Sequence, residues 1–101
     1  MVKHVILWTL KEDLSAAEKE KVKLEIKEGL EGLKDKLEGI IDIRVNIQGL
    51  DSSNVDLMLD STFESEEALK SYSGHPEHLA VANGKVRPFT AVRACFDFEV
   101  G

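Results

Sequence analysis

The sequence predicts an α+β protein of the ferredoxin-like, split βαβ type, with helices on one face of a four-stranded antiparallel sheet. The first observation is the order of hydrophobic periods along the chain, which predicts strand, helix, strand, strand, broken helix and strand. The second is the composition, since 101 residues, 43% of them apolar and 32% charged, suffice for one modest core but not for two. We therefore expect a single domain over residues 1–101.

The first strand and the first helix are the clearest elements. Val2 to Leu10 is rich in β-branched, aromatic and aliphatic residues, which predicts a strand with two apolar faces. Ser15 and Glu18 have the spacing of a capping box, which predicts a helix from about Ser15 to Leu37. The apolar face of this helix has spacings of four, four, three and four residues, through Val22, Ile26, Leu30, Leu33 and Leu37.

A hairpin is expected next. Residues 41–48 alternate between apolar and polar side chains, with Ile41, Ile43, Val45 and Ile47 on the apolar side, as in a half-buried strand at a sheet edge. Residues 49–54 are rich in turn-forming residues. A third strand then alternates from Val55 to about Phe63, so the two strands should pair.

The last third of the chain predicts a broken helix and a terminal strand. Ser65 can cap a helix that Gly74 ends, and Pro76 suits the first turn of a second segment. That segment carries apolar residues toward Pro88. The final strand alternates through Val92, Ala94, Phe96, Phe98 and Val100.

The predicted sheet has one face without helices, and this face predicts self-association. Helices connected by right-handed crossovers lie on the same side of the sheet. The other side carries those apolar residues of the first and last strands that point away from the helices, among Val5, Leu7, Phe96 and Phe98. Because such a large apolar patch is rarely left in water, we expect a homodimer packed through the helix-free sheet face.

Charge and composition exclude several classes of partner. The net charge is −6 and the charges are interspersed, so we expect no nucleic-acid partner. No stretch without Asp, Glu, Lys or Arg exceeds seven residues, so we expect no membrane helix. The lone Cys95 has no internal disulfide partner and suits a reducing compartment, and we expect a cytoplasmic protein.

Four segments in order resemble the stress-responsive A/B-barrel (Dabb) family over nearly the whole chain. They are Lys3-His4-Val5-Ile6-Leu7, Phe63-Glu64-Ser65, Tyr72 with His75-Pro76-Glu77-His78, and the run from Val92 to Phe98. The resemblance implies a dimeric α+β barrel. It also implies that some members are stress-associated proteins without assigned chemistry, while a plant branch contains polyketide cyclases in which the positions of His78 and Tyr72 supply a base and an assisting group. The first helix here lacks the aromatic residues that a bulky aromatic substrate favours, so the cyclase substrate is not carried over.

The residues themselves support the same pair. A neutral His78 imidazole can take a proton from carbon, and the Tyr72 phenol can donate to a developing enolate oxygen, which requires no cofactor. This predicts a small-molecule cavity with proton-transfer chemistry of the cyclase, isomerase or decarboxylase type. In the alternative, His78 and Tyr72 only pack the helix break, and the protein is a non-catalytic homo-oligomeric stress-associated protein.

Further side chains are candidates for binding. His4, Ile6 and Trp8 share one face of the first strand. If this face points toward the helices, the three residues would lie at one cavity with Tyr72 and His78. His75 precedes His78 by three residues and is a further candidate. A buried, hydrogen-bonded His4 and a core Trp8 are the alternatives.

A three-histidine metal site and a haem site with Trp8 and Asn83 lack an established spacing, so we predict neither metal nor cofactor. Cys95 is expected to be an inert thiol, and Arg93 and Asp97 to pair with neighbours at a sheet edge.

Overall fold

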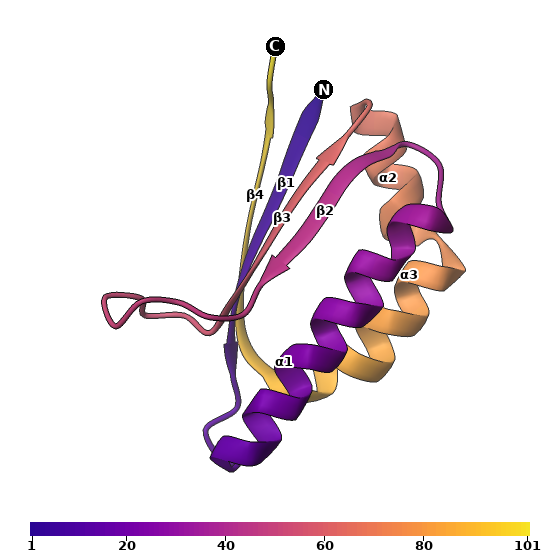
Figure 1. Ribbon diagram of the computed structural model, residues 1–101. Helices are drawn as coiled ribbons and strands as arrows, with labels where there is room; N and C mark the ends of the chain where they lie inside the picture. The colour runs from indigo at the N-terminus through magenta and orange to yellow at the C-terminus, as the bar shows by residue number, and fades with distance from the viewer.

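The computed structural model describes residues 1–101 and contains one antiparallel sheet with the strand order β2-β3-β1-β4 (Figure 1). The strands are β1 (Val2–Leu10), β2 (Ile40–Asn46), β3 (Leu57–Phe63) and β4 (Thr90–Glu99). The first strand of the chain lies in the middle of the sheet, between β3 and the last strand. As predicted, β2 forms a hairpin with β3 and lies at an edge of the sheet.

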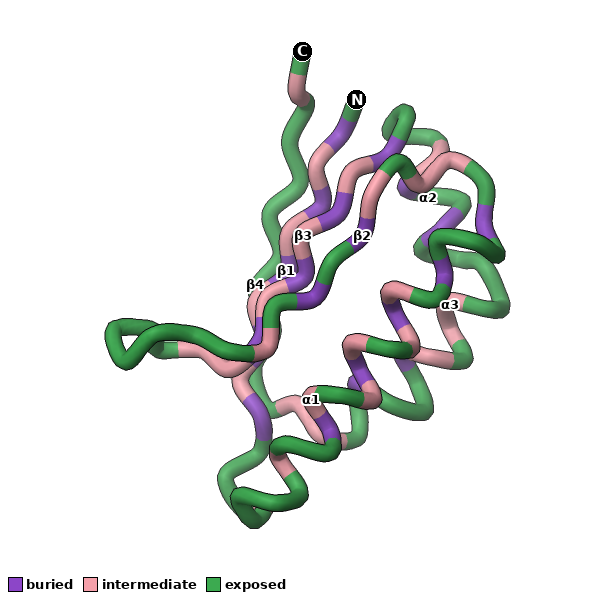
Figure 2. Tube along the Cα trace, viewed as in Figure 1, coloured by how far each residue is buried: buried purple, intermediate pink, exposed green.

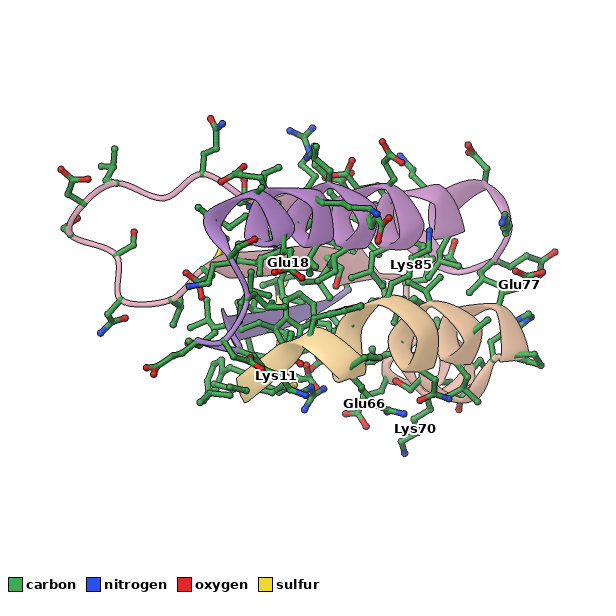
Figure 3. The ribbon with its side chains drawn as sticks, turned by 90° about the horizontal axis from the view of Figure 1, so that it is seen from below. Lys11, Glu18, Glu66, Lys70, Glu77 and Lys85 are labelled. Atoms are coloured by element: carbon green, nitrogen blue, oxygen red, sulfur yellow. The ribbon has the colours of Figure 1, made fainter.

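All the helices lie on one face of this sheet, which confirms the predicted fold class (Figure 1). They are α1 (Ala16–Glu31), α2 (Glu66–Gly74) and α3 (Pro76–Val81), and α1 runs beside the other two (Figure 3). Glu66 and Lys70 of α2 are exposed and lie on the side of this helix away from α1 (Figure 3). None of these helices has the length and hydropathy needed to cross a membrane.

The start of α1 is as predicted, but its end is not. Ser15 Oγ accepts from the Glu18 N–H group over 3.1 Å, and the Glu18 carboxylate accepts from the Ser15 N–H group over 3.0 Å, which confirms the capping box. The helix was expected to reach Leu37, yet its α-helical part ends at Glu31 and a 3-10 segment, Gly32–Asp35, follows. Glycine weakens an α-helix, and the last turns of helices often tighten in this way.

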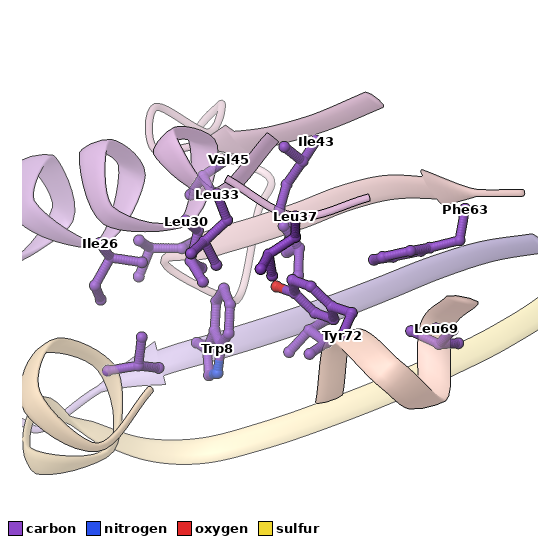
Figure 4. Close-up of a cluster of buried hydrophobic side chains, with 14 of the residues drawn as sticks. Trp8, Ile26, Leu30, Leu33, Leu37, Ile43, Val45, Phe63, Leu69 and Tyr72 are labelled. Atoms are coloured by element: carbon purple, nitrogen blue, oxygen red, sulfur yellow. The ribbon is translucent and has the colours of Figure 1, made fainter. Parts of the chain in front are cut away.

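The core lies between the helices and the sheet (Figure 4). Alternate residues of β1 are buried along its whole length, so the face of His4, Ile6 and Trp8 does point toward the helices. The predicted apolar face of the first helix is buried in full, with Val22, Ile26, Leu30, Leu33 and Leu37 each less than 9% exposed. Phe63 and Val45 are completely buried.

The second and third strands differ in detail from the predictions, and β2 covers Ile40–Asn46 rather than residues 41–48. Ile41 was expected on the buried side of the second strand but is 39% exposed, because the register with β3 shifts between Ile40 and Asp42 and changes the alternation there. The third strand begins at Leu57 rather than at Val55. The reason is that Asp56 binds the end of β1: its N–H group donates to Trp8 O over 2.9 Å, and its carboxylate accepts from the Leu10 N–H group over 2.8 Å.

Gly39 connects the first helix to β2 in a conformation that favours glycine. Its φ is +87°, in the left-handed region that a Cβ atom disfavours. A Cβ atom at this position would lie 2.8 Å from the Ala68 Cβ atom, closer than van der Waals contact allows. The backbone of Gly39 therefore packs directly against α2, which sets the distance between that helix and the start of β2.

The side of the sheet near β4 is open to solvent. Every residue of β4 after Thr90 is exposed (Figure 2). Val5 pairs with Phe96 and Leu7 with Ala94 in the register of β1 and β4, so these residues lie on the helix-free face. The largest apolar side chains of β4 are well exposed, Phe96 at 68%, Val92 at 60% and Phe98 at 39%.

Candidate functional site

The break between α2 and α3 places His78 beside the core. His75 ends the first helix, because its N–H group donates to Tyr72 O over 3.1 Å. It also begins the second helix, because its Nδ1 atom accepts from the Glu77 N–H group over 3.1 Å. Pro76 occupies the first helical position, where its missing N–H group costs nothing. His78 consequently lies in the first turn of α3, facing back toward Tyr72.

Tyr72 and His78 are in direct contact, with ring centroids 4.3 Å apart. The His78 Nδ1–H group donates to Ser73 O over 3.1 Å, which fixes the tautomer and leaves the Nε2 lone pair free. Burial lowers the pKa of His78, and the positive charges of Arg87 and Arg93 act in the same direction against the Ser73 bond. The imidazole is therefore neutral near pH 7, with Nε2 able to accept a proton.

Tyr72 carries a donor without an acceptor. The side chain is 2% exposed, and its hydroxyl group is buried with no hydrogen-bond partner. Burial raises the pKa of the phenol well above its ordinary value, so the group stays protonated. Buried polar groups are nearly always paired, and an unpaired one indicates a ligand or a water molecule that completes it. The Tyr72 hydroxyl therefore has a hydrogen-bond donor that no group of the protein uses.

A cavity of about 70 Å³ lies between the helices and the sheet at this pair. Its walls include the predicted residues Ile6, Trp8, Tyr72 and His78, which the fold brings together from β1, α2 and α3. Aliphatic side chains of α1, β3 and the segment after α3 complete the apolar part. A space of this size holds a few water molecules or a compound of a few heavy atoms.

The other two predicted binding residues lie elsewhere. His4 is outside the cavity walls, and its ring lies edge-on to Tyr72 and Phe63, with centroid distances of 6.3 and 6.2 Å. Its Nδ1–H group donates to Asp97 Oδ1 over 2.5 Å, so it supports Tyr72 from behind as a buried, hydrogen-bonded histidine. His75 is exposed and lines a separate surface depression next to Lys36, so its observed contacts are those of a helix cap.

One group of side chains has donor atoms close enough for a cation. His4, Cys95 and Asp97 place their donor atoms within 4.8 Å of one another, whereas the three histidines considered from the sequence do not gather. The Cys95 sulfur lies 3.4 Å from Asp97 Oδ1 and 3.8 Å from His4 Nδ1. Burial and the neighbouring Asp97 raise the pKa of the thiol, which keeps it protonated. A metal ion could bind here only by displacing the imidazole–carboxylate hydrogen bond and the thiol proton.

The sequence analysis missed two charged residues of the cavity. Arg93 was expected to pair with neighbours at the sheet edge, but it lies opposite Trp8 in the register of β1 and β4 and lines the cavity. Arg87, in the turn after α3, lines it as well. The alternation of side chains along the last strand shows from sequence which residues share a strand face with Arg93. The pairing register that places Arg93 opposite Trp8 has no such signal.

The fold and the cavity define a ferredoxin-like α+β domain with a small site between its helices and its sheet. The model of the stress responsive A/B barrel domain (Dabb) matches residues 2–100. The chain therefore belongs to the Dabb family.

Solved structures agree with this assignment. A dimeric protein of unknown function with a ferredoxin-like fold from Bacteroides fragilis is 32% identical, with a TM-score of 0.91 over 98% of this chain and 95% of that chain. A Dabb family protein from Mesorhizobium loti is 18% identical, with a TM-score of 0.75 over 99% and 97%. A hydroxynitrile lyase from Passiflora edulis is 13% identical, with a TM-score of 0.74 over 99% and 93%, a likeness of fold alone. The comparison with curated proteins finds no match.

Proposed function

We propose that the cavity binds a small carbonyl compound and that the protein catalyses proton transfer on it without a cofactor. One observation carries the proposal: Tyr72, whose hydroxyl is buried and unpartnered, lines the same cavity as the neutral His78. A donor and a base facing one small space are the two groups that enolisation requires. The lyase of similar fold from Passiflora edulis supports the view that this architecture can carry chemistry.

In the proposed reaction His78 is the base and Tyr72 is the assisting acid. His78 Nε2 removes a proton from the carbon next to the carbonyl group, and the electron pair of the C–H bond moves toward the carbonyl oxygen. The Tyr72 hydroxyl donates to that oxygen as it becomes negative, in a site with few competing waters. If the Nε2 proton is replaced by one from solvent before a proton returns to the same carbon, the result is exchange, whereas return to another carbon gives isomerisation. Attack of the enolate carbon on a second carbonyl group gives cyclisation, and the alkoxide formed then takes the proton from Nε2.

The surroundings of the pair suit these roles. The Ser73 carbonyl holds His78 through Nδ1, so the basic nitrogen keeps one orientation. Burial raises the pKa of Tyr72, so the phenol stays protonated and keeps a hydrogen for donation to an enolate oxygen. The cavity of about 70 Å³ limits the reacting part of the substrate to a few heavy atoms. We therefore propose a small substrate rather than a bulky aromatic one.

The test is exchange of carbon-bound protons with deuterium, followed by NMR in D2O on a panel of small ketones and keto acids. We expect His78→Ala to slow the catalysed exchange roughly a hundredfold or more, as loss of a general base does, and Tyr72→Phe to slow it less. His75→Asn is the matched control, because asparagine preserves the helix cap and His75 lies outside the cavity. Equal exchange by wild type and His78→Ala, or no exchange on the whole panel, would overturn the catalytic proposal.

We further propose that the protein is a homodimer through the helix-free face of its sheet. The exposed Val92, Phe96 and Phe98 support this face as the interface. The Bacteroides fragilis protein, described as dimeric, supports the oligomeric state. Native mass spectrometry tests it, with a mass of twice 11.2 kDa expected and a monomer as the contradicting result.

The same face favours one alternative, a non-catalytic homo-oligomeric stress-associated protein. In that case the apolar strand β4 would be the functional surface and the Tyr72–His78 pair would only pack the helix break. The exchange experiment separates the two functions, because the alternative predicts that His78→Ala changes nothing while disruption of the sheet face changes the assembly.

A further inference from the structure

Two arginines at the cavity have no carboxylate partner. The chain contains only Arg44, Arg87 and Arg93, and of these Arg44 pairs with Asp42 over 3.3 Å. Neither Arg87 nor Arg93 forms a salt bridge, although the protein has 19 acidic residues. Both line the cavity of Tyr72 and His78, and no Asp or Glu does. In a protein with a net charge of −6, the cavity is therefore locally positive.

The two guanidinium groups reach the cavity from different elements. Arg93 lies on β4 opposite Trp8, on the side of the sheet that faces the helices. Arg87 follows the π turn Ala82–Val86, and its guanidinium group donates to Asn83 Oδ1. Asn83 is neutral, so this hydrogen bond orients Arg87 without compensating its charge. Both charges also act on His78, where they help to lower its pKa, so their field extends across the cavity.

We propose that Arg87 and Arg93 form an anion-binding subsite that selects small carboxylates, so that the natural ligand is a carbonyl compound carrying a carboxylate group. The guanidinium fork binds a carboxylate through two parallel hydrogen bonds, a geometry that a neutral amide does not match. Thr90, a residue with a hydroxyl donor, also lines the cavity. This subsite rests on the proposed function, for which it names the substrate class. The binding of a carboxylate by Arg87 and Arg93 does not itself require that the protein catalyses a reaction.

The position of this subsite fits the proposed chemistry. A carboxylate held between Arg87 and Arg93 leaves the rest of a short molecule directed at Tyr72 and His78, because all of them line one space of about 70 Å³. The bound negative charge would also compensate the two positive charges near His78. Ligand binding would then raise the pKa of His78, which makes it a stronger base when the substrate is present.

The experiment compares carboxylates with their neutral amides. Pyruvate and acetate are titrated against pyruvamide and acetamide, with binding followed by the NMR signals of the protein and by the titration midpoint of His78. We expect each carboxylate to bind roughly tenfold or more tightly than its amide. Arg93→Gln and Arg87→Gln should each remove most of this preference, whereas Arg44→Gln, the paired arginine far from the cavity lining, should preserve it. Added salt should weaken carboxylate binding and leave amide binding unchanged.

Several results would overturn the inference. They are equal affinity for carboxylate and amide, a preference that persists in the Arg87→Gln, Arg93→Gln double variant, and no binding of either carboxylate at tens of millimolar. The results that would contradict the proposed reaction differ from those that would contradict the subsite. Arginine-dependent carboxylate binding without deuterium exchange leaves the subsite standing and removes the chemistry, whereas His78-dependent exchange on neutral ketones without a carboxylate preference does the opposite.

Discussion

The two edge strands of the sheet, β2 and β4, differ in whether side chains bind their outer backbone groups. At the β2 edge, the Val45 N–H group donates to the Glu31 carboxylate over 2.9 Å, and Lys27 Nζ donates to Val45 O over 2.8 Å. Lys27 and Glu31 are paired with each other over 2.7 Å, so side chains of α1 satisfy both outer backbone groups of Val45 in β2. At the β4 edge no side chain does so, and the strand carries the exposed Phe96 and Val92.

This difference shows which half of the protein is complete within one chain. An edge strand with satisfied backbone groups does not template pairing with another chain, while an open apolar edge does. The β2 edge is capped at Val45 by its own helix, whereas the β4 edge is open, in agreement with the interface proposed above. The cavity also lies toward β4, since Arg93 is one of its walls. The proposed interface and the proposed ligand site therefore lie in the same half of the molecule.

The largest expected effect is on the proposed interface. Phe96→Asp should prevent dimerisation, because burying a phenylalanine contributes about 2 to 3 kcal/mol and a two-fold interface contains it twice. We expect the dimer dissociation constant to rise roughly a thousandfold or more, measured by sedimentation equilibrium. Ile41→Asp, an equally drastic change at an exposed position of β2, is the control and should leave the dimer unchanged. If Phe96→Asp remains a tight dimer, another surface forms the interface.

Removal of side-chain methyl groups should distinguish the two edge strands by its effect on the free energy of unfolding of one protomer. Val45→Ala removes completely buried methyl groups from β2 and should lower the free energy of unfolding by about 2 to 3 kcal/mol. Val92→Ala removes methyl groups that are 60% exposed on β4 and should change it by no more than about 0.5 kcal/mol. Urea unfolding of both variants in the monomeric Phe96→Asp background provides the measurement. Equal losses would show that the β4 edge is packed within the protomer.

A smaller difference is expected for the polar pairs on the two strands. Asp97→Ala leaves the buried His4 Nδ1 without its partner and should cost about 1 to 2 kcal/mol of stability. Asp42→Ala breaks a solvent-exposed pair with Arg44 on β2 and should cost less than about 0.5 kcal/mol. Thermal unfolding distinguishes these values. A negligible effect of Asp97→Ala would mean that water replaces the carboxylate at His4.

The smallest expected effect is on the stability that Glu31 provides at the β2 edge, and this effect depends on pH. Burial alone would raise the pKa of Glu31, but hydrogen bonds from Lys27 and Val45 and the positive charges of Lys27 and Arg44 outweigh it, so the pKa is lowered. A carboxylate with a lowered folded-state pKa stabilises above its unfolded-state pKa and loses that contribution as the pH falls through the folded value. Glu31→Gln should therefore cost about 0.5 to 1 kcal/mol at pH 7 and less at pH 3, measured by urea unfolding. A pH-independent cost would contradict this assignment.

The sequence predicted the fold because its local signals agree with one another. The capping box of Ser15 and Glu18 and the spacing of the apolar residues in α1 depend on neighbouring residues only, and both are confirmed. The strand from Val2 to Leu10 was also predicted, but its two apolar faces left open which of them points toward the helices, so the burial of Trp8 became clear only from the structure. Ile41 was misplaced because a one-residue register shift in β2 has no signal in the alternation itself.

The cavity was harder to anticipate because it depends on contacts between distant segments. His75 and His78 belong to one short motif, yet only His78 faces the cavity, since the backbone bonds at the helix break decide the direction of each. Arg93 joined the site through the register of β1 and β4, strands more than eighty residues apart. The π turn that carries the chain to Arg87 has no sequence pattern of its own.

The central position of β1 has a consequence for how the chain reaches this fold. Val2 pairs with Phe63 on one side and with Glu99 on the other, so the first strand acquires its neighbours only after most of the chain has been synthesised. Contacts between residues so far apart in sequence close slowly, and unpaired apolar strands are prone to aggregation in the meantime. The order of synthesis leaves one edge of β1 without a paired strand until β4 has been made, although β1 is the first strand of the chain.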